Sequence, residues 1–373
     1  MAMSLHRHKL DSVNNKEFIE IQLDKDNVVF QGSEQEAMGV YLSGSLVFRL
    51  KEATAIKHIR LNLCGVRKVT LPSRAAGFKR PSRETEFYKQ SWQFHDVYRT
   101  TPEVFPAGDY KYPFNVILEG SMPESIEGLK DASIKYCFSV EIGRKHGKNL
   151  SYERPLRVIR APKPACTDIT LDEIWAQKIA YRVDIRNKVV AFGTSIDVGY
   201  DFVPLLPGLK IAHIESQLTE TRDLTLNEDD LVSGRNNSST TTVLASDRYE
   251  VDESTPRHTT KSRAGLQFSR SLQLPRCLGQ CVQDTSSLGI EIKHKLKIHV
   301  RLQNPDGHLS ELRLAIPISI YLSPHYRVWE GETFSGEAPP VVMENELSDE
   351  APPPYGQHEM DRAFDEHYQV AAI

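Results

Sequence analysis

Apolar and polar residues alternate with a period of two in short stretches along most of the chain. In Phe18–Leu23, for example, isoleucines and a leucine alternate with Glu20 and Gln22, which is the period of a half-buried β-strand. The same period is found in Val40–Leu50, Ile59–Leu63, Tyr136–Ile142, Ala180–Ile185, Thr194–Val198 and Lys210–Leu218. Convincing amphipathic helices are almost absent, so the pattern predicts an all-β protein.

The clearest of these signals comes near the end of the alternating region. Ile290–Leu302 alternates, the NPDG stretch Asn304–Gly307 follows, and the alternation resumes over Leu312–Leu322. Turn residues between two period-two runs predict a β-hairpin. His294 falls on the apolar phase, where we expect a hydrogen-bonded core or edge histidine and not a metal ligand. Pro317 falls on the polar phase, which predicts an edge position or a bulge.

The phase of this hairpin also predicts which side chains are buried. Leu296, Ile298 and Ile316 should face a sandwich core, whereas Lys293 and Lys297 should point away from it. We therefore expect a charge at any of the three apolar positions to be disruptive, and alanine at either lysine to be tolerated.

Two sets of strands, separated by a proline-rich stretch, predict two immunoglobulin-like β-sandwich domains. The expected layout is a polar leader over 1–15, an N-terminal sandwich over 16–160, a linker over 161–171, a C-terminal sandwich over 172–325 and an acidic, disordered tail over 326–373. Residues 71–91 are expected to be a solvated loop or a basic contact surface, with Arg74, Lys79, Arg80, Arg83 and Lys89. A disordered loop rich in serine and threonine is expected at about 220–264.

Composition and charge limit the class of protein. The chain has 373 residues, of which 39% are hydrophobic, enough for sizeable cores. It contains no apolar run long enough to span a bilayer and no signal-like N-terminus, which predicts cytosolic residence. From Tyr326 onward, 11 acidic residues face 2 basic ones, and the preceding part has 39 acidic and 44 basic residues. The mildly basic body could meet an anionic membrane surface or acidic protein segments, or the charge could be ordinary scatter.

The residues that carry chemistry in enzymes show no catalytic pattern. The sequence lacks GxSxG, a phosphate-cradling glycine loop and HExxH. The five cysteines are scattered: Cys64 and Cys137 lie in strand-like stretches, where we expect small buried hydrophobes. Cys277 and Cys281 form CxxxC without a second ligand pair, so no structural zinc is expected. We therefore predict no catalytic residues, no metal, no cofactor and no nucleic-acid partner.

One short segment in the acidic tail is a ligand in its own right. Pro352, Pro353, Pro354 and Tyr355 form a PPxY motif. Consecutive prolines favour a polyproline II helix, which aligns proline and the following tyrosine along one edge. Such a segment loses little conformational entropy when it docks into an aromatic-lined groove. PPxY is the pattern that WW domains recognise, in particular those of HECT-type ubiquitin ligases.

Several stretches of the chain resemble one known family. Ala107–Ile142 resembles the latter part of an arrestin N-terminal domain, and Ile174–Leu218 and Leu296–Ile320 resemble an arrestin C-terminal domain. With the PPxY tail, the chain over about Phe18–Phe364 is similar to the fungal α-arrestins, which are arrestin-related trafficking adaptors. Tyr355 to His358, with Asp361 following, is similar to the extended tail motif of these adaptors.

The resemblance implies two arrestin-type β-sandwiches without catalysis. It implies that Pro352, Pro353, Tyr355 and His358 bind the WW domains of a Nedd4/Rsp5-type HECT ligase. The ligase would be brought to plasma-membrane transporters or permeases, which would then be ubiquitinated and endocytosed, in relation to carbon catabolite repression. The protein would be cytoplasmic and recruited peripherally to the plasma membrane and endosomes. A retromer-like trafficking scaffold that acts without a ligase is the alternative, and the PPxY motif argues against it.

Two further expectations follow from the resemblance. These fungal adaptors usually continue past the equivalent of Ile373 and often have a second PPxY, which predicts either a short isoform or weaker avidity for ligases with several WW domains. The adaptors are also commonly ubiquitinated by the ligase that they recruit. The tail has no lysine after Lys297, so the acceptors should lie on the body or its loops. Lys178, Lys188 and Lys261 are the candidates.

Overall fold

The fold was analysed in a computed structural model, which describes residues 17–73, 79–96, 102–163, 167–227, 236–251, 258–260 and 263–324. All regular elements in these ranges are β-strands. Within the described ranges, no helix is long and apolar enough to cross a membrane.

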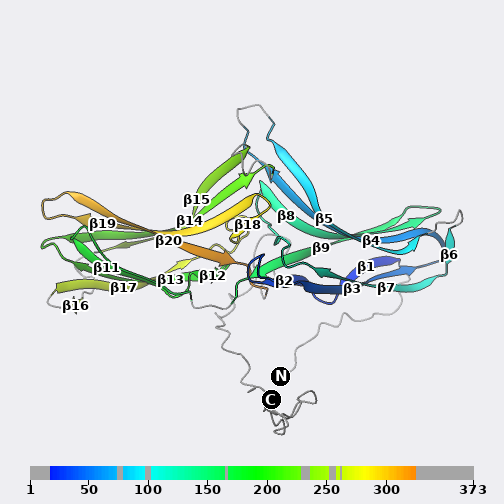
Figure 1. Ribbon diagram of the computed structural model, residues 1–373, viewed down its shortest axis with the longest axis horizontal. Helices are drawn as coiled ribbons and strands as arrows, with labels where there is room; N and C mark the ends of the chain where they lie inside the picture. Colours follow the sequence, from blue (N-terminus) through cyan, green and yellow to red (C-terminus); the bar gives the residue numbers. More distant parts are fainter. Residues whose placement is uncertain are drawn as a thin grey trace, which may run out of the picture. The chain divides into compact units, whose positions relative to one another are not determined.

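The N-terminal sandwich consists of two sheets (Figure 1). The smaller has the order β1-β3-β7, with β1 Phe18–Leu23, β3 Val40–Leu50 and β7 Gly108–Leu118. The larger has the order β2-β9-β8-β4-β5, with β2 Asn27–Gln31, β9 Leu150–Ala161, β8 Ala132–Arg144, β4 Thr54–Thr70 and β5 Ser82–Asp96. β6 (Glu103–Phe105) also pairs with β4. Apolar side chains from both sheets, such as Phe48 and Phe138, form one buried core.

The C-terminal sandwich also consists of two sheets. One has the order β10-β11-β13-β17-β16, with β10 Ile169–Trp175, β11 Ile179–Ile185, β13 Ser195–Pro204, β17 Arg263–Gln273 and β16 His258–Thr260. The other has the order β12-β20-β19-β14-β15, with β12 Val189–Ala191, β20 Leu309–Tyr321, β19 Ile290–Gln303, β14 Lys210–Thr225 and β15 Asn237–Glu250. β18 (Thr285–Ser287) pairs with β19. A second buried core fills the space between these sheets.

The predicted hairpin at the end of the body is confirmed. β19 and β20 pair antiparallel, and the turn is closed by a hydrogen bond from the Gly307 amide to the Asn304 carbonyl at 2.9 Å. Leu296, Ile298 and Ile316 are buried in the C-terminal core. Pro317 is paired with Lys295 of β19, but the amide of Ser319, two residues on, points away from β19 to the Lys188 carbonyl. The Pro317 nitrogen therefore faces the other side of β20, beyond the end of β12, which pairs only with Ser319–Tyr321. The missing amide proton of Pro317 therefore interrupts no ladder there.

Two stretches that the sequence predicts to be loops contain strands instead. Residues 82–96 form β5, which pairs with β4 along its length, and residues 237–250 form β15, which pairs with β14. Both are edge strands, so each can expose polar side chains without burying them. Aromatic residues such as Phe87 and Trp92 fix β5 to the N-terminal core, and the threonines of β15 favour extended backbone. β10 likewise begins at Ile169, inside the expected linker.

Candidate functional site

The predicted ligase-binding residues lie outside the described part of the chain. Pro352, Pro353, Tyr355 and His358 all follow Pro324, where the description ends, and Lys261 falls in an internal gap. Their roles stay predictions that depend on sequence alone.

The structure distinguishes the two candidate ubiquitin acceptors that it describes. The Lys178 ammonium group is partly buried and lies 3.0 Å from Asn304 Oδ1 and 3.4 Å from Ser310 Oγ. It therefore fastens the β10–β11 turn to the β19–β20 hairpin. Lys188 lies between β11 and β12, and its carbonyl accepts a hydrogen bond from the Ser319 amide at 2.8 Å. Its half-buried side chain makes no ion pair or hydrogen bond with the other residues that the structure describes. The two lysines are similarly buried, and Lys188 is favoured as an acceptor because its amine is not held by hydrogen bonds as that of Lys178 is.

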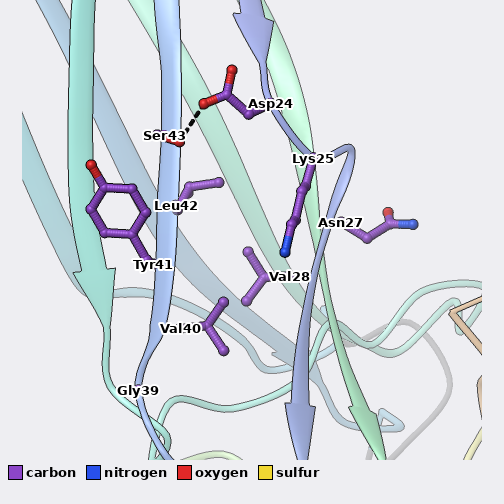
Figure 2. A pocket seen from close by; sticks show the side chains of 9 residues that line it. All are labelled: Asp24, Lys25, Asn27, Val28, Gly39, Val40, Tyr41, Leu42 and Ser43. Carbon is purple, nitrogen blue, oxygen red and sulfur yellow. Dashed lines mark hydrogen bonds between the residues drawn. The ribbon is translucent and has the colours of Figure 1, made fainter. Parts of the chain in front are cut away.

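A hollow of about 370 Å³ lies in the N-terminal sandwich where the chain crosses from one sheet to the other. The crossing joins β1, in the small sheet, to β2, which runs parallel to β9 in the large sheet. Figure 2 shows Asp24, Lys25 and Asn27 from the crossing on one side and the start of β3 on the other. The Ser43 hydroxyl donates a hydrogen bond to Asp24 and holds the crossing against β3.

Exposed apolar side chains lie beside this hollow. Tyr41 is directly opposite Ile117 in the β3–β7 ladder, so both side chains lie on one face of the small sheet. Met38, Tyr41 and Ile117 are 85%, 59% and 67% exposed. The nine residues that line the hollow include no cysteine or histidine. A hollow lined by both apolar and polar side chains, with an apolar rim, suits contact with a protein segment.

A second group of residues is buried and charged. Glu220 of β14 and His294 of β19 point into the C-terminal sandwich, and both are fully buried. His294 Nε2 lies 3.1 Å from Glu220 Oε2, and His294 Nδ1 lies 2.6 Å from Asp284 Oδ1. Glu220 also accepts a hydrogen bond from the Val282 amide at 3.0 Å and pairs with Arg222. The group connects segment 281–284 to two strands of the sheet.

The electrostatics of this cluster favour a protonated imidazole. Burial alone would lower the pKa of His294, but hydrogen bonds to Asp284, Cys281 and Glu220 raise this pKa to about 11. Burial opposes ionisation of Glu220 as well, yet hydrogen bonds from His294 and Val282, with the charge of Arg222, leave its pKa below the usual value. The expectation that His294 is a hydrogen-bonded core histidine is therefore confirmed.

The same residues meet the minimum geometry for a metal site. One ligand atom each from Glu220, Cys281 and His294 lies within 4.8 Å of the others. In the protonated imidazole, however, the Nε2–H group donates a hydrogen bond to Glu220 and so leaves no lone pair for a metal, and burial raises the pKa of the Cys281 thiol. The cluster satisfies its own charges as an ion pair, so its role is structural.

This ion pair predicts an unusual dependence of stability on pH. The folded-state pKa of His294, about 11, exceeds its unfolded value of 6.5. The stabilisation is therefore complete below about pH 6.5 and is lost as the pH rises towards 11, by up to about 1.4 kcal/mol per pH unit. Urea midpoints between pH 6 and 10 should fall more steeply in the wild type than in His294→Gln. Parallel curves would show that the imidazole is neutral in the folded protein.

Another buried contact joins residues of the two sandwiches. Arg67, in β4, is buried; its Nε donates to the Leu288 carbonyl at 2.5 Å and its Nη1 donates to the Leu226 carbonyl at 3.0 Å. Its Nη2 donates to the Thr225 carbonyl. Gly289 has a φ of +73°, and a Cβ atom there would lie 3.3 Å from Arg67 Nη2. The glycine thus allows both the turn and the close approach of the guanidinium group.

Arg67 and Glu220 are charged residues at positions where the alternation of their strands calls for apolar ones. This signal was not used in the sequence analysis. Arg67 continues the buried phase of Leu61 and Leu63, and Glu220 continues the phase of Ser216 and Leu218. A charged residue on the apolar phase of a strand indicates a buried partner. The identity of that partner follows only from the fold.

Comparison with protein families agrees with this architecture. Residues 19–163 match the family described as "Arrestin (or S-antigen), N-terminal domain", and residues 175–325 match "Arrestin (or S-antigen), C-terminal domain". The chain belongs to the arrestin family. The predicted all-β fold with two arrestin domains is confirmed, and membership agrees with the expectation that this arrestin is not an enzyme.

Individual relatives of this arrestin are fungal proteins. It is 55% identical over 370 residues to the "HECT-type ubiquitin ligase-interacting protein apyA" of Emericella nidulans, covering 97% of this chain and 99% of the relative. It is 44% identical over 365 residues to the "HECT-type ubiquitin ligase-interacting protein creD" of the same species, covering 95% of this chain and 61% of the relative. A probable creD of Aspergillus terreus is also 44% identical, with 63% of it covered. The chain thus spans about three-fifths of the creD proteins.

Proposed function

We propose that this arrestin is an adaptor that recruits a HECT-type ubiquitin ligase. The observation that carries the proposal is the PPxY motif of Pro352–Tyr355, on a chain whose fungal relatives are named for interaction with such ligases. The two sandwiches support an adaptor because they offer binding surfaces and show no catalytic arrangement among the described residues. The motif supplies a linear ligand that WW domains bind.

The cargo of the adaptor is the second part of the proposal. We infer that it acts in the cytoplasm, is recruited peripherally to the plasma membrane and endosomes, and brings the ligase to transporters or permeases, as part of carbon catabolite repression. The hollow between β2 and β3, with its apolar rim at Tyr41, is the surface that best suits a peptide segment of a cargo protein. Proximity labelling at the plasma membrane, with wild type and Tyr355→Ala compared, tests this part. Transporter labelling should persist in the variant while ligase labelling is lost.

Tyr355→Ala should abolish most of the binding to the WW domains of a HECT ligase. A buried aromatic anchor contributes about 2 kcal/mol or more at an interface, which is roughly thirtyfold in affinity. Isothermal titration of the full chain with purified WW domains measures the effect. Tyr368→Ala is a matched control, because Tyr368 lies in the same acidic tail without preceding prolines. Equal affinity of wild type and Tyr355→Ala would leave a ligase-independent trafficking scaffold as the function.

Variants at the motif prolines and at His358 give a second test of WW-domain binding. Pro352→Ala and Pro353→Ala remove preorganisation and groove contacts, and His358→Ala removes a residue of the extended motif. Pro339→Ala is the control, since Pro339 and Pro340 form a proline pair without a following tyrosine. We expect the three motif variants to weaken WW binding and the control to leave it unchanged.

Ubiquitin should be attached to Lys188 more readily than to Lys178. HECT transfer requires an amine that is free to attack a thioester, and the Lys178 amine is held by Asn304 and Ser310. Mass spectrometry after reaction with a HECT ligase should find a ubiquitin remnant on Lys188, lost in Lys188→Arg and in Tyr355→Ala. Lys261 is the candidate outside the described residues. A dominant remnant on Lys178 would contradict this ranking.

A further inference from the structure

Two cysteines lie directly opposite each other on neighbouring strands of the N-terminal sandwich. In the antiparallel pairing of β4 with β8, the register partner of Cys64 is Cys137. Directly opposed residues in such a ladder have Cα atoms about 4.5–5.5 Å apart and side chains on the same face. A disulfide needs a Cα separation of about 4.4–6.8 Å. The backbone therefore already has the spacing that a disulfide requires.

Both thiols lie on the outer face of the sheet. The adjacent residues Leu63, Tyr136 and Phe138 are buried in the core, whereas Cys64 and Cys137 are half-buried. This corrects the expectation that both cysteines are small core hydrophobes, because the strand phase turns them away from the core. A small reagent can thus reach the pair without unfolding the domain.

The neighbours of the pair come from the two flanking strands, β5 and β9. Lys89 of β5 is opposite Cys64, and Pro155 of β9 is opposite Cys137. Burial and the nearby Glu86 carboxylate raise the pKa of Cys64. Burial, the charge of Glu153 and the charge of Cys64 all raise the pKa of Cys137. Both thiols are therefore largely protonated at neutral pH, which makes the first attack slow and leaves the pair reduced until a disulfide reagent is present.

We propose that Cys64 and Cys137 form a dithiol site that closes to a disulfide by exchange with a small disulfide such as oxidised glutathione. One cysteine loses its proton and attacks the small disulfide, which releases one glutathione thiol and leaves a mixed disulfide on the protein. The second cysteine then attacks the protein sulfur of that mixed disulfide and releases the second glutathione thiol. The protein loses two electrons and two protons, and the glutathione disulfide gains them as two thiols.

The geometry makes the second step faster than the first. The resolving thiol is held directly opposite the mixed disulfide on the neighbouring strand, so its attack is intramolecular and needs no rearrangement of the strands. The mixed disulfide should therefore not accumulate in the wild type. The other described cysteines, Cys277 and Cys281, lie outside the named strands and so have no thiol directly opposite in a strand ladder. Cys281 Sγ is buried 4.0 Å from His294 Nε2.

Oxidation of the full chain by glutathione disulfide, followed by mass spectrometry, tests the site. The intact protein should lose two hydrogens without a glutathione adduct at this pair, free thiols should drop from five to three, and a peptide with Cys64 should be linked to one with Cys137. Because attack needs a thiolate, the rate should rise by about tenfold per pH unit below the thiol pKa.

Single variants make the result decisive. In Cys64→Ser, the glutathione adduct should remain on Cys137, and in Cys137→Ser it should remain on Cys64, since neither can be resolved. Cys277→Ser is the matched control and should close the disulfide at the wild-type rate. Stable adducts on Cys64 and Cys137 in the wild type, or linkage of either to another cysteine, would overturn the proposal.

Discussion

Leu296→Asp should unfold the C-terminal sandwich. Leu296 lies in the middle of β19, fully buried, between Leu218 of β14 and Ile316 of β20. Aspartate there removes core contacts and buries a carboxylate among apolar side chains, since His294, two residues away on the same face, is already paired with Glu220 and Asp284. The combined cost is about 5 kcal/mol or more, which is comparable with the whole stability of a typical domain.

The adjacent residue provides the control for this variant. Lys295 lies one position away on the exposed face of the same strand, so Lys295→Ala should change the free energy of unfolding by no more than about 0.5 kcal/mol. Circular dichroism and limited proteolysis of both variants measure the difference. Equal tolerance of the two substitutions would mean that the phase of β19 has been assigned wrongly.

Arg67→Met should destabilise the protein by about 4 kcal/mol. Methionine retains most of the apolar stem but removes the three donors that satisfy the carbonyls of Thr225, Leu226 and Leu288. Each buried acceptor left unsatisfied costs about 1–3 kcal/mol. The stability of Arg67→Lys should fall between that of the wild type and that of Arg67→Met, because an ammonium group cannot reach all three carbonyls from one position.

Arg60→Met separates this effect from a general loss of charge. Arg60 lies on the exposed face of the same strand, where its ion pair with Asp96 is 3.4 Å long and solvated. Surface pairs of this kind contribute about 0–1 kcal/mol. Denaturant midpoints should therefore shift strongly in Arg67→Met and little in Arg60→Met, and amide exchange at Leu226 and Leu288 should increase only in the former. Similar midpoints for both variants would contradict a buried role for Arg67.

The alternating strands could be predicted from sequence because one face of each is buried. β1 and β3 have the predicted bounds, and the predicted burial of Leu296 and Ile316 is confirmed. β5 and β15 were missed because both are edge strands: polar residues on both faces weaken the period-two signal. The partners of Arg67 could not be predicted, since the Leu288 carbonyl is 221 positions away in sequence and only the completed topology brings it close.

The PPxY motif, unlike the partners of Arg67, could be predicted because it does not depend on the fold. Its recognition requires four consecutive residues and no tertiary contact, so its signal is entirely local. The hollow at Asp24 and the thiol pair at Cys64 depend instead on register and on the crossing between sheets. Alternation predicts which face of a strand is buried, but it does not predict which strand lies alongside.

The N-terminal core is completed by residues from the second half of the chain. Leu224, Val282, Ile290 and Ile292 pack with the first sandwich and not with the second. A ribosome therefore finishes β9 long before it supplies the last of these side chains. At about 5–20 residues per second, the delay is on the order of ten seconds. During that interval the nascent N-terminal sandwich exposes an unfilled apolar surface, and we expect it to depend on chaperones until Ile292 has emerged.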